Sequence, residues 1–81
     1  MRTPRYSKLA KKNLERLDAP TKKRIRAGIN GLPNGNVKKL QGHDELYRLR
    51  IGDWRIVFSY PDEKTTLIER ISPRGGIYKE V

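Results

Sequence analysis

The chain has 81 residues, with 19 lysines and arginines against 9 aspartates and glutamates, a net charge of +10 and no cysteine. This length allows one modest core, so we expect a single domain over residues 1–81, and the composition excludes disulfides, cysteine-ligated zinc, thiol catalysis and a membrane-spanning helix. The lack of disulfides suits the cytoplasm, and the positive charge favours a polyanionic partner, either a nucleic acid or an acidic protein.

The first part of the sequence predicts two amphipathic helices after a short N-terminal segment. Residues 1–5 carry Pro4 and can form at most an edge strand. Ser7 and Asp18 are candidate N-caps, and Pro20 fits the first turn of the second helix. The short connection between the helices predicts an antiparallel pair. The apolar positions at helical spacing are Tyr6, Leu9, Ala10, Leu14 and Leu17, followed by Ile25, Ile29 and Leu32.

The pattern changes from helices to strands after the second helix. Gly28 and Gly31 weaken that helix, and GLPNGN at residues 31–36 ends it. VKKLQG at residues 37–42 reads as a short strand or an extended loop. The three segments with strand composition are ELYRLRI, WRIVFSY and TTLIERI. The predicted fold is α+β, a two-helix hairpin packed on one face of a small antiparallel sheet of about four strands.

The dipeptide Gly52-Asp53 predicts a two-residue hairpin loop, which fixes the cross-strand register. Ile51 then pairs with Trp54, Arg50 with Arg55, Leu49 with Ile56, Arg48 with Val57 and Tyr47 with Phe58. Because side chains alternate between the two faces of a sheet, Arg48, Arg50 and Arg55 share one face. The other face holds Tyr47, Leu49, Ile51, Trp54, Ile56 and Phe58 and is expected to face the helices.

Three guanidinium groups on the open face of the sheet predict an anion site. Like charges directly opposite each other across a strand pair are destabilising, so their presence needs a reason. Guanidinium groups match phosphate oxygens and stay charged at any relevant pH. The alternative is a solvated polar face on which arginine is common. We expect Arg48, Arg50, Arg55 and Arg70 to bind RNA.

Cleavage of a phosphodiester also needs groups that assist the attacking and the leaving oxygen. RNA carries its own nucleophile, the 2′-OH, so we expect no metal and no cofactor. His43 is a candidate general base, and its alternative is an ordinary loop histidine. In the tail, Arg74 and Tyr78 flank two glycines. Surrounding arginines would favour the phenolate form of Tyr78 as a proton shuttle, whereas a single tail tyrosine can equally pack or anchor a hydrogen bond.

The stretch LYRLRIGDWRIVFSY, followed by the acidic turn in PDEKTTLIERI and then by SPRGGIY, resembles the RelE-type toxins of the RelE/ParE superfamily. The helical hairpin and VKKLQGHDELYRLRI fit the same layout, so the resemblance covers nearly the whole chain, and the hairpin is its most specific part. It implies a RelE-like fold and a ribosome-dependent mRNA endonuclease. Such a toxin enters the 30S A site and cuts the exposed codon by attack of the 2′-OH, leaving a 2′,3′-cyclic phosphate. The implied partners are a RelB-like antitoxin, expected to be acidic, the ribosome and mRNA, with no membrane.

The resemblance also implies roles for five residues. Arg55 would bind the scissile phosphate and the charge that develops there, while Arg48 and Arg50 would hold neighbouring phosphates. Arg74 would stand near the leaving 5′-oxygen as proton donor or charge stabiliser. Tyr78 would stack on a base or help to deprotonate the 2′-OH.

One departure from the family pattern concerns proton transfer. The best-known members have lysines where this sequence has Arg48 and Arg50. Arginine keeps the charge but is a poor base, which moves the proton transfer to Tyr78 or His43.

Three other functions remain open at this point. A ParE-like toxin would share the fold but target gyrase, and such toxins generally lack the full basic cluster with the tail arginine and tyrosine. A non-catalytic basic domain that binds RNA or an antitoxin would keep the basic face without depending on Tyr78. A decayed or engineered member would bind its antitoxin without cutting RNA.

Overall fold

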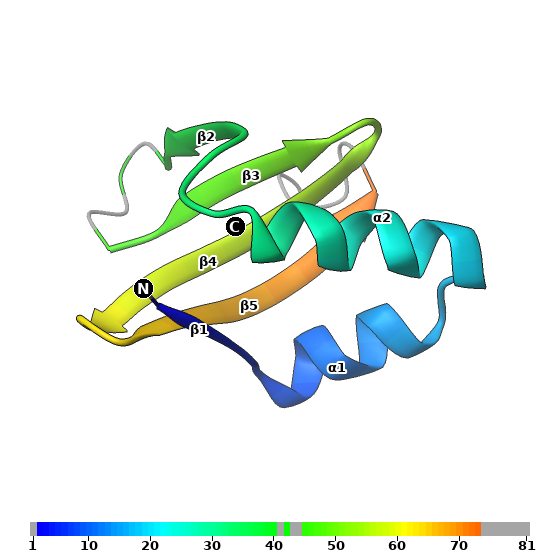
Figure 1. Ribbon diagram of the computed structural model, residues 1–81, viewed down its shortest axis with the longest axis horizontal. Coiled ribbons are helices and arrows are strands. Elements are labelled where there is room, and N and C mark those ends of the chain that lie inside the picture. Colours follow the sequence, from blue (N-terminus) through cyan, green and yellow to red (C-terminus); the bar gives the residue numbers. More distant parts are fainter. Residues whose placement is uncertain (1, 41, 43–44, 74–81) are drawn as a thin grey trace.

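Two helices lie on one face of a five-stranded sheet in the computed structural model, which describes residues 2–40, 42 and 45–73 (Figure 1). In chain order the elements are β1 (Thr3–Tyr6), α1 (Lys8–Glu15), α2 (Ala19–Asn30), β2 (Asn36–Lys39), β3 (Tyr47–Ile51), β4 (Trp54–Asp62) and β5 (Thr65–Pro73). The strand order is β1-β5-β4-β3-β2. This arrangement confirms the predicted α+β fold, with both helices on one side of the sheet.

The sheet differs from the prediction at its two edges. Both segments that the sequence left open form short strands, β1 and β2, so the described sheet has five strands instead of about four. β1 runs parallel to β5, with Thr3 opposite Thr65 and Tyr6 opposite Ile68. The expectation of a purely antiparallel sheet is therefore wrong. A parallel pair needs a long crossover, and the chain between β1 and β5, which includes both helices, provides it.

Both helices begin at the predicted caps. The Ser7 hydroxyl accepts a hydrogen bond from the backbone N–H of Ala10 at 3.0 Å. The Asp18 carboxylate accepts hydrogen bonds from the hydroxyl and the backbone N–H of Thr21, and these bonds lower the pKa of Asp18. Pro20 lies in the first turn of α2, as expected. Within the described residues, neither helix is long and apolar enough to cross a membrane.

The core lies between the helices and the sheet, as the hairpin register predicts. Each predicted pair of the β3–β4 hairpin is present, from Ile51–Trp54 to Tyr47–Phe58. The core-face residues are buried or pack against the buried cluster. Leu9 is the exception among the predicted apolar positions, because Ala10 takes the fully buried site on α1 while Leu9 is 44% exposed.

A glycine inside α2 allows the helix to approach the β3–β4 hairpin closely. A Cβ atom on Gly28 would overlap the Cδ1 atom of Ile51. The sequence indicated only that Gly28 weakens the helix, but the structure gives the glycine a packing role. At the tip of the hairpin, Gly52 has a φ of +57°, a left-handed conformation that glycine adopts without strain.

Candidate nucleic-acid interface

Four arginines on β3, β4 and β5 lie on the sheet face that points away from the helices, and Arg5 on the edge strand β1 lies on the same face. Cross-strand pairing aligns Arg48 with Val57 and Arg70 in one row, and it aligns Arg50 with Arg55 in the next. The opposite face of the same strands packs into the core. This placement confirms that Arg48, Arg50 and Arg55 share one face and adds Arg70 to them. We call Arg48, Arg50, Arg55 and Arg70 the arginine face.

The four guanidinium groups differ in exposure. Arg50, beside the hairpin turn, is exposed, and Arg55 and Arg70 are half-buried. Arg48 is only 9% exposed, so the expectation of a fully open face is wrong at this position. The physical reason is its place in the middle of the sheet, where its row also contains Lys38 on β2 and Val57 on β4.

The buried end of the Arg48 side chain lacks a hydrogen bond to any described residue. Its Nη1 atom is buried and has no hydrogen-bond partner within the part of the chain that the structure describes. A buried charged donor without a partner is costly. An anion bound on the arginine face would offset the charge of this guanidinium, so the side chain is suited to phosphate binding.

A β-bulge in β5 places a carboxylate on the same side as the arginines. Ile68 and Ile71 are both in the core although they are three residues apart, and the pairing of β5 with β4 shifts between Val57 and Phe58. The two residues between the isoleucines, Glu69 and Arg70, therefore both lie on the arginine face. The Ser59 hydroxyl donates a hydrogen bond to Oε2 of Glu69 at 3.1 Å.

Glu69 is a functional candidate that the sequence analysis missed. Strict alternation along β5 would put neighbouring residues on opposite faces, so it would not group Glu69 with Arg70. The signal that could have found it is the spacing of Ile68 and Ile71, which breaks the two-residue period. Such a break indicates a bulge.

The other predicted site residues, His43, Arg74 and Tyr78, lie outside the described residues. β5 ends at Pro73, which pairs with Trp54, and the preceding Ser72 pairs with Arg55. The strand that leads to Arg74 thus ends beside the arginine face. Among the described residues, no group of three or more histidine, aspartate or glutamate side chains could hold a metal ion.

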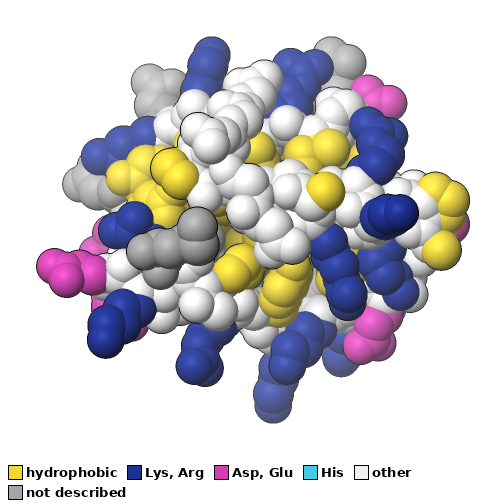
Figure 2. Space-filling view, in the orientation of Figure 1, with side chains coloured by type: hydrophobic (Ala, Val, Ile, Leu, Met, Phe, Trp, Pro, Cys, Tyr) yellow, Lys and Arg dark blue, Asp and Glu magenta, His cyan; other side chains and the backbone are white. Residues whose placement is uncertain are grey.

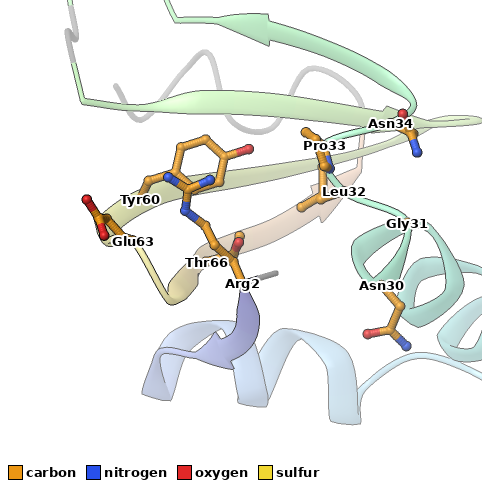
Figure 3. Close-up of a pocket in the computed structure, with 9 residues that line it drawn as sticks. All are labelled: Arg2, Asn30, Gly31, Leu32, Pro33, Asn34, Tyr60, Glu63 and Thr66. Atoms are coloured by element: carbon orange, nitrogen blue, oxygen red, sulfur yellow. The ribbon is translucent and has the colours of Figure 1, made fainter.

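A cavity of about 480 Å³ lies on the helix side of the sheet, between the C-terminal end of α2 and the β4–β5 turn (Figure 3). The guanidinium carbon of Arg2 lies 4.1 Å from the centre of the Tyr60 ring, and its Nε donates to the backbone oxygen of Asp62. Glu63 also lines the cavity and adds negative charge. Because Arg2, the cation of this cavity, already contacts Tyr60 and Asp62, the cavity is a weaker anion site than the arginine face.

The sequence matches a known toxin family over most of its length. Residues 5–78 match the family described as the ParE toxin of the type II toxin–antitoxin system parDE. The chain is also 42% identical over 45 residues to a protein of Methanocaldococcus jannaschii named "Putative toxin RelE1". This match covers 54% of the chain and spans only half the length of that relative.

Two solved structures share the fold. One is the RelB–RelE antitoxin–toxin complex from Methanococcus jannaschii, with a TM-score of 0.76, 24% sequence identity, and coverage of 93% of this chain and 95% of the other. The second is the toxin–antitoxin complex RelBE2 from Mycobacterium tuberculosis, with a TM-score of 0.77, 23% identity, and coverage of 90% and 98%. At these identities the likeness establishes the arrangement of helices and strands.

Proposed function

Because the chain belongs to the ParE toxin family, within the RelE/ParE superfamily of type II toxin–antitoxin toxins, we propose that it is a RelE-type toxin that cuts mRNA on the ribosome. The observation that carries this proposal is the arginine face, with four guanidinium groups on neighbouring strands. Such a cluster fits the backbone of RNA. It also fits the extra charge that develops on phosphorus when the 2′-OH attacks.

The proposed roles follow the position of each arginine on the face. Arg55 lies on the central strand β4, directly opposite Arg50 and next to Arg48 on β3. We assign the scissile phosphate to Arg55, and the neighbouring phosphates to Arg48, Arg50 and Arg70. Arg74 and Tyr78 keep the roles that the family resemblance implies. Arg74 acts at the leaving 5′-oxygen, and Tyr78 acts at a nucleobase or at the 2′-OH.

The proposed partners are the ribosomal 30S A site with its mRNA and a RelB-like antitoxin. Both solved relatives are toxins in complex with an antitoxin. A partly disordered acidic antitoxin would be attracted by the net charge of +10, and its charge and apolar contacts would offset the entropy of ordering it. Action on translated mRNA places the toxin in the cytoplasm.

The matched family favours a second candidate, a gyrase-targeting toxin of the ParE type. The two candidates share the fold and differ in what the arginine face does. A nuclease needs these guanidinium groups for its chemistry, whereas a gyrase-targeting toxin would stop growth without cutting RNA.

The test compares mRNA cutting and growth arrest on induction of the wild type, Arg55→Ala, Tyr78→Ala and the control Lys23→Ala. Lys23 is an exposed residue of α2, in the helical layer. Primer extension is run on a translated message and on its untranslated twin. We expect the wild type and Lys23→Ala to cut only the translated message. Arg55→Ala should lower the cutting rate by about 10²–10³-fold, the usual effect of removing one preorganised charge stabiliser, and Tyr78→Ala should also impair cutting.

The remaining outcomes separate the alternatives. Growth arrest without cutting would support the gyrase-targeting toxin. If induction of the wild type causes neither growth arrest nor mRNA cutting, the protein is a binding module or an inactive member. A thermal melt of Arg55→Ala is needed beside these assays, because an unfolded variant would say nothing about the role of the guanidinium.

A further inference from the structure

The proposed cut lacks a proton acceptor among the arginines. Attack by the 2′-OH requires removal of its proton, and a guanidinium group cannot accept this proton because it is already protonated at physiological pH. The inference that follows rests on the proposed function. It concerns which side chain of this face accepts that proton.

We propose that Glu69, in place of Tyr78 or His43, is the general base. The bulge at Glu69 and Arg70 brings a carboxylate to the arginine face, where regular alternation would have excluded one of the two side chains. Glu69 directly precedes Arg70 in β5, so its carboxylate lies beside the cluster on this face. A carboxylate is a group that can accept a proton in the transition state.

The local contacts orient the Glu69 side chain. Oε2 accepts the hydrogen bond of the Ser59 hydroxyl, and this is the hydrogen bond that the structure gives the carboxylate within its described part. The backbone oxygen of Glu69 accepts a second bond, from the Ser7 hydroxyl at 2.8 Å. Ser7 is the N-cap of α1, so the bulge is anchored to the helical layer. Within the described residues Oε1 has no hydrogen bond, so its lone pairs are available to accept a proton.

The position of Glu69 also matches the direction of the attack. Neighbouring strands are about 4.8 Å apart, and β3, β4 and β5 are consecutive in the sheet. A phosphate held by Arg48 and Arg55, on β3 and β4, therefore places its attached ribose within reach of a glutamate on β5. The guanidinium groups hold the phosphate, and Glu69 faces the sugar.

The reaction balances without any further reactant. Oε1 of Glu69 takes the 2′-OH proton as the 2′-oxygen forms a bond to phosphorus. The bond from phosphorus to the 5′-oxygen breaks, and this oxygen takes a proton from water or from an acidic group of the complex. The products are a 2′,3′-cyclic phosphate and a 5′-OH. Glu69 then releases its proton to solvent, which restores the carboxylate and the proton balance.

A purely electrostatic role for Glu69 predicts a different result. If the carboxylate only offsets the positive charge of the face, its removal strengthens RNA binding and leaves the chemical step as fast as before. If it is the base, its removal still permits tight binding but slows the chemical step, because general base catalysis contributes about 10²–10⁴-fold. Binding and single-turnover cleavage therefore have to be measured separately.

The experiment uses the full chain added in excess to ribosomes stalled on a translated mRNA. It compares the wild type, Glu69→Gln and the control Glu63→Gln, which removes the same charge in the β4–β5 turn, at the cavity on the helix side. We expect Glu69→Gln to cut at least ~100-fold more slowly at saturation, with binding as tight as that of the wild type or tighter. Glu63→Gln should behave as the wild type.

Two further results decide the proposal. Glu69→Asp, which keeps a carboxylate, should cut more slowly than the wild type but faster than Glu69→Gln, and it serves where Glu69→Gln does not fold. If Glu69→Gln cuts as fast as the wild type, Glu69 is not the base, although the nuclease function stands. If the wild type itself does not cut, the proposed function fails and the inference fails with it.

Discussion

Arg48 combines two properties that act against each other. The residue is 9% exposed, and its buried Nη1 atom has no hydrogen-bond partner within the described residues, so the free protein bears a desolvation cost. The same burial would make its interaction with a bound phosphate stronger, because charges attract more in a less polar environment. A residue kept for stability would not be an arginine here.

This reasoning predicts that Arg48→Met stabilises the protein and impairs cutting. Methionine has a similar shape without the charge, and replacing a poorly paired buried ion by an apolar residue is often neutral or stabilising by about 1 kcal/mol or more. Cutting should fall by about 10²-fold or more, as for loss of a charge stabiliser. Urea denaturation measures the first effect and primer extension measures the second.

Arg50→Met is the matched control for this prediction. Arg50 is an exposed residue of the same strand, so its free energy of unfolding should stay within about 0.5 kcal/mol of the wild type. A loss of about 3–5 kcal/mol in Arg48→Met would contradict the argument, because it would indicate that the guanidinium is well paired in the free protein.

Single-residue predictions succeeded where strand alternation is regular and failed where it breaks. Arg48, Arg50 and Arg55 were placed correctly because a two-residue turn fixes both the register and the faces of β3 and β4. Glu69 was missed because a bulge changes the alternation within β5. The exposure of Leu9 was missed because helical periodicity does not decide between two adjacent apolar residues.

The contact between α2 and β3 depends on Gly28. Its missing side chain leaves room for Ile51, so the helix can pack on the hairpin that carries Arg48 and Arg50. Intrinsic helix propensity alone would favour alanine at this position by about 1 kcal/mol. The steric overlap acts in the opposite direction, and overpacking of a core usually costs about 1–3 kcal/mol.

We therefore predict that Gly28→Ala lowers the free energy of unfolding by up to about 2 kcal/mol, as measured in urea. Adding Ile51→Val removes the Cδ1 atom that a Cβ would overlap, so the double variant should recover part of the loss. The control is Gly31→Ala, where a Cβ would meet only backbone oxygens at 3.5 Å and the φ of −84° suits any residue. If Gly28→Ala is more stable than the wild type, propensity outweighs packing at this contact.

At the level of elements, local signals predicted the helices and the hairpin but not the edges of the sheet. The caps at Ser7 and Asp18 and the turn at Gly52 are encoded by a few adjacent residues. The pairing of β1 with β5 joins segments about 60 residues apart, with both helices in the chain between them. A strand of four residues with a proline gives little local signal for such a partner.

For the whole molecule, the net charge does not by itself locate the proposed RNA site. Lysine and arginine side chains also spread over the helical side of the protein (Figure 2). The exposed basic residues of this layer are Lys8, Lys11, Lys12, Arg16, Lys23, Arg24 and Arg26. These charges would raise the rate of encounter with any polyanion. The arginine face differs because its cations lie in aligned rows on consecutive strands.

The salt dependence of binding to a single-stranded RNA can separate the two surfaces. Each phosphate contact adds about −0.7 to the slope of log K against log salt for a single strand, because neutralised phosphates release counterions. Engagement of the four arginines of the face predicts a wild-type slope of about −3. Arg50→Ala should reduce its magnitude by about 0.7, whereas Lys23→Ala on α2 should leave it unchanged. If both variants reduce the slope equally, the RNA contacts the helical layer as well, and the arginine face is not the dominant binding surface.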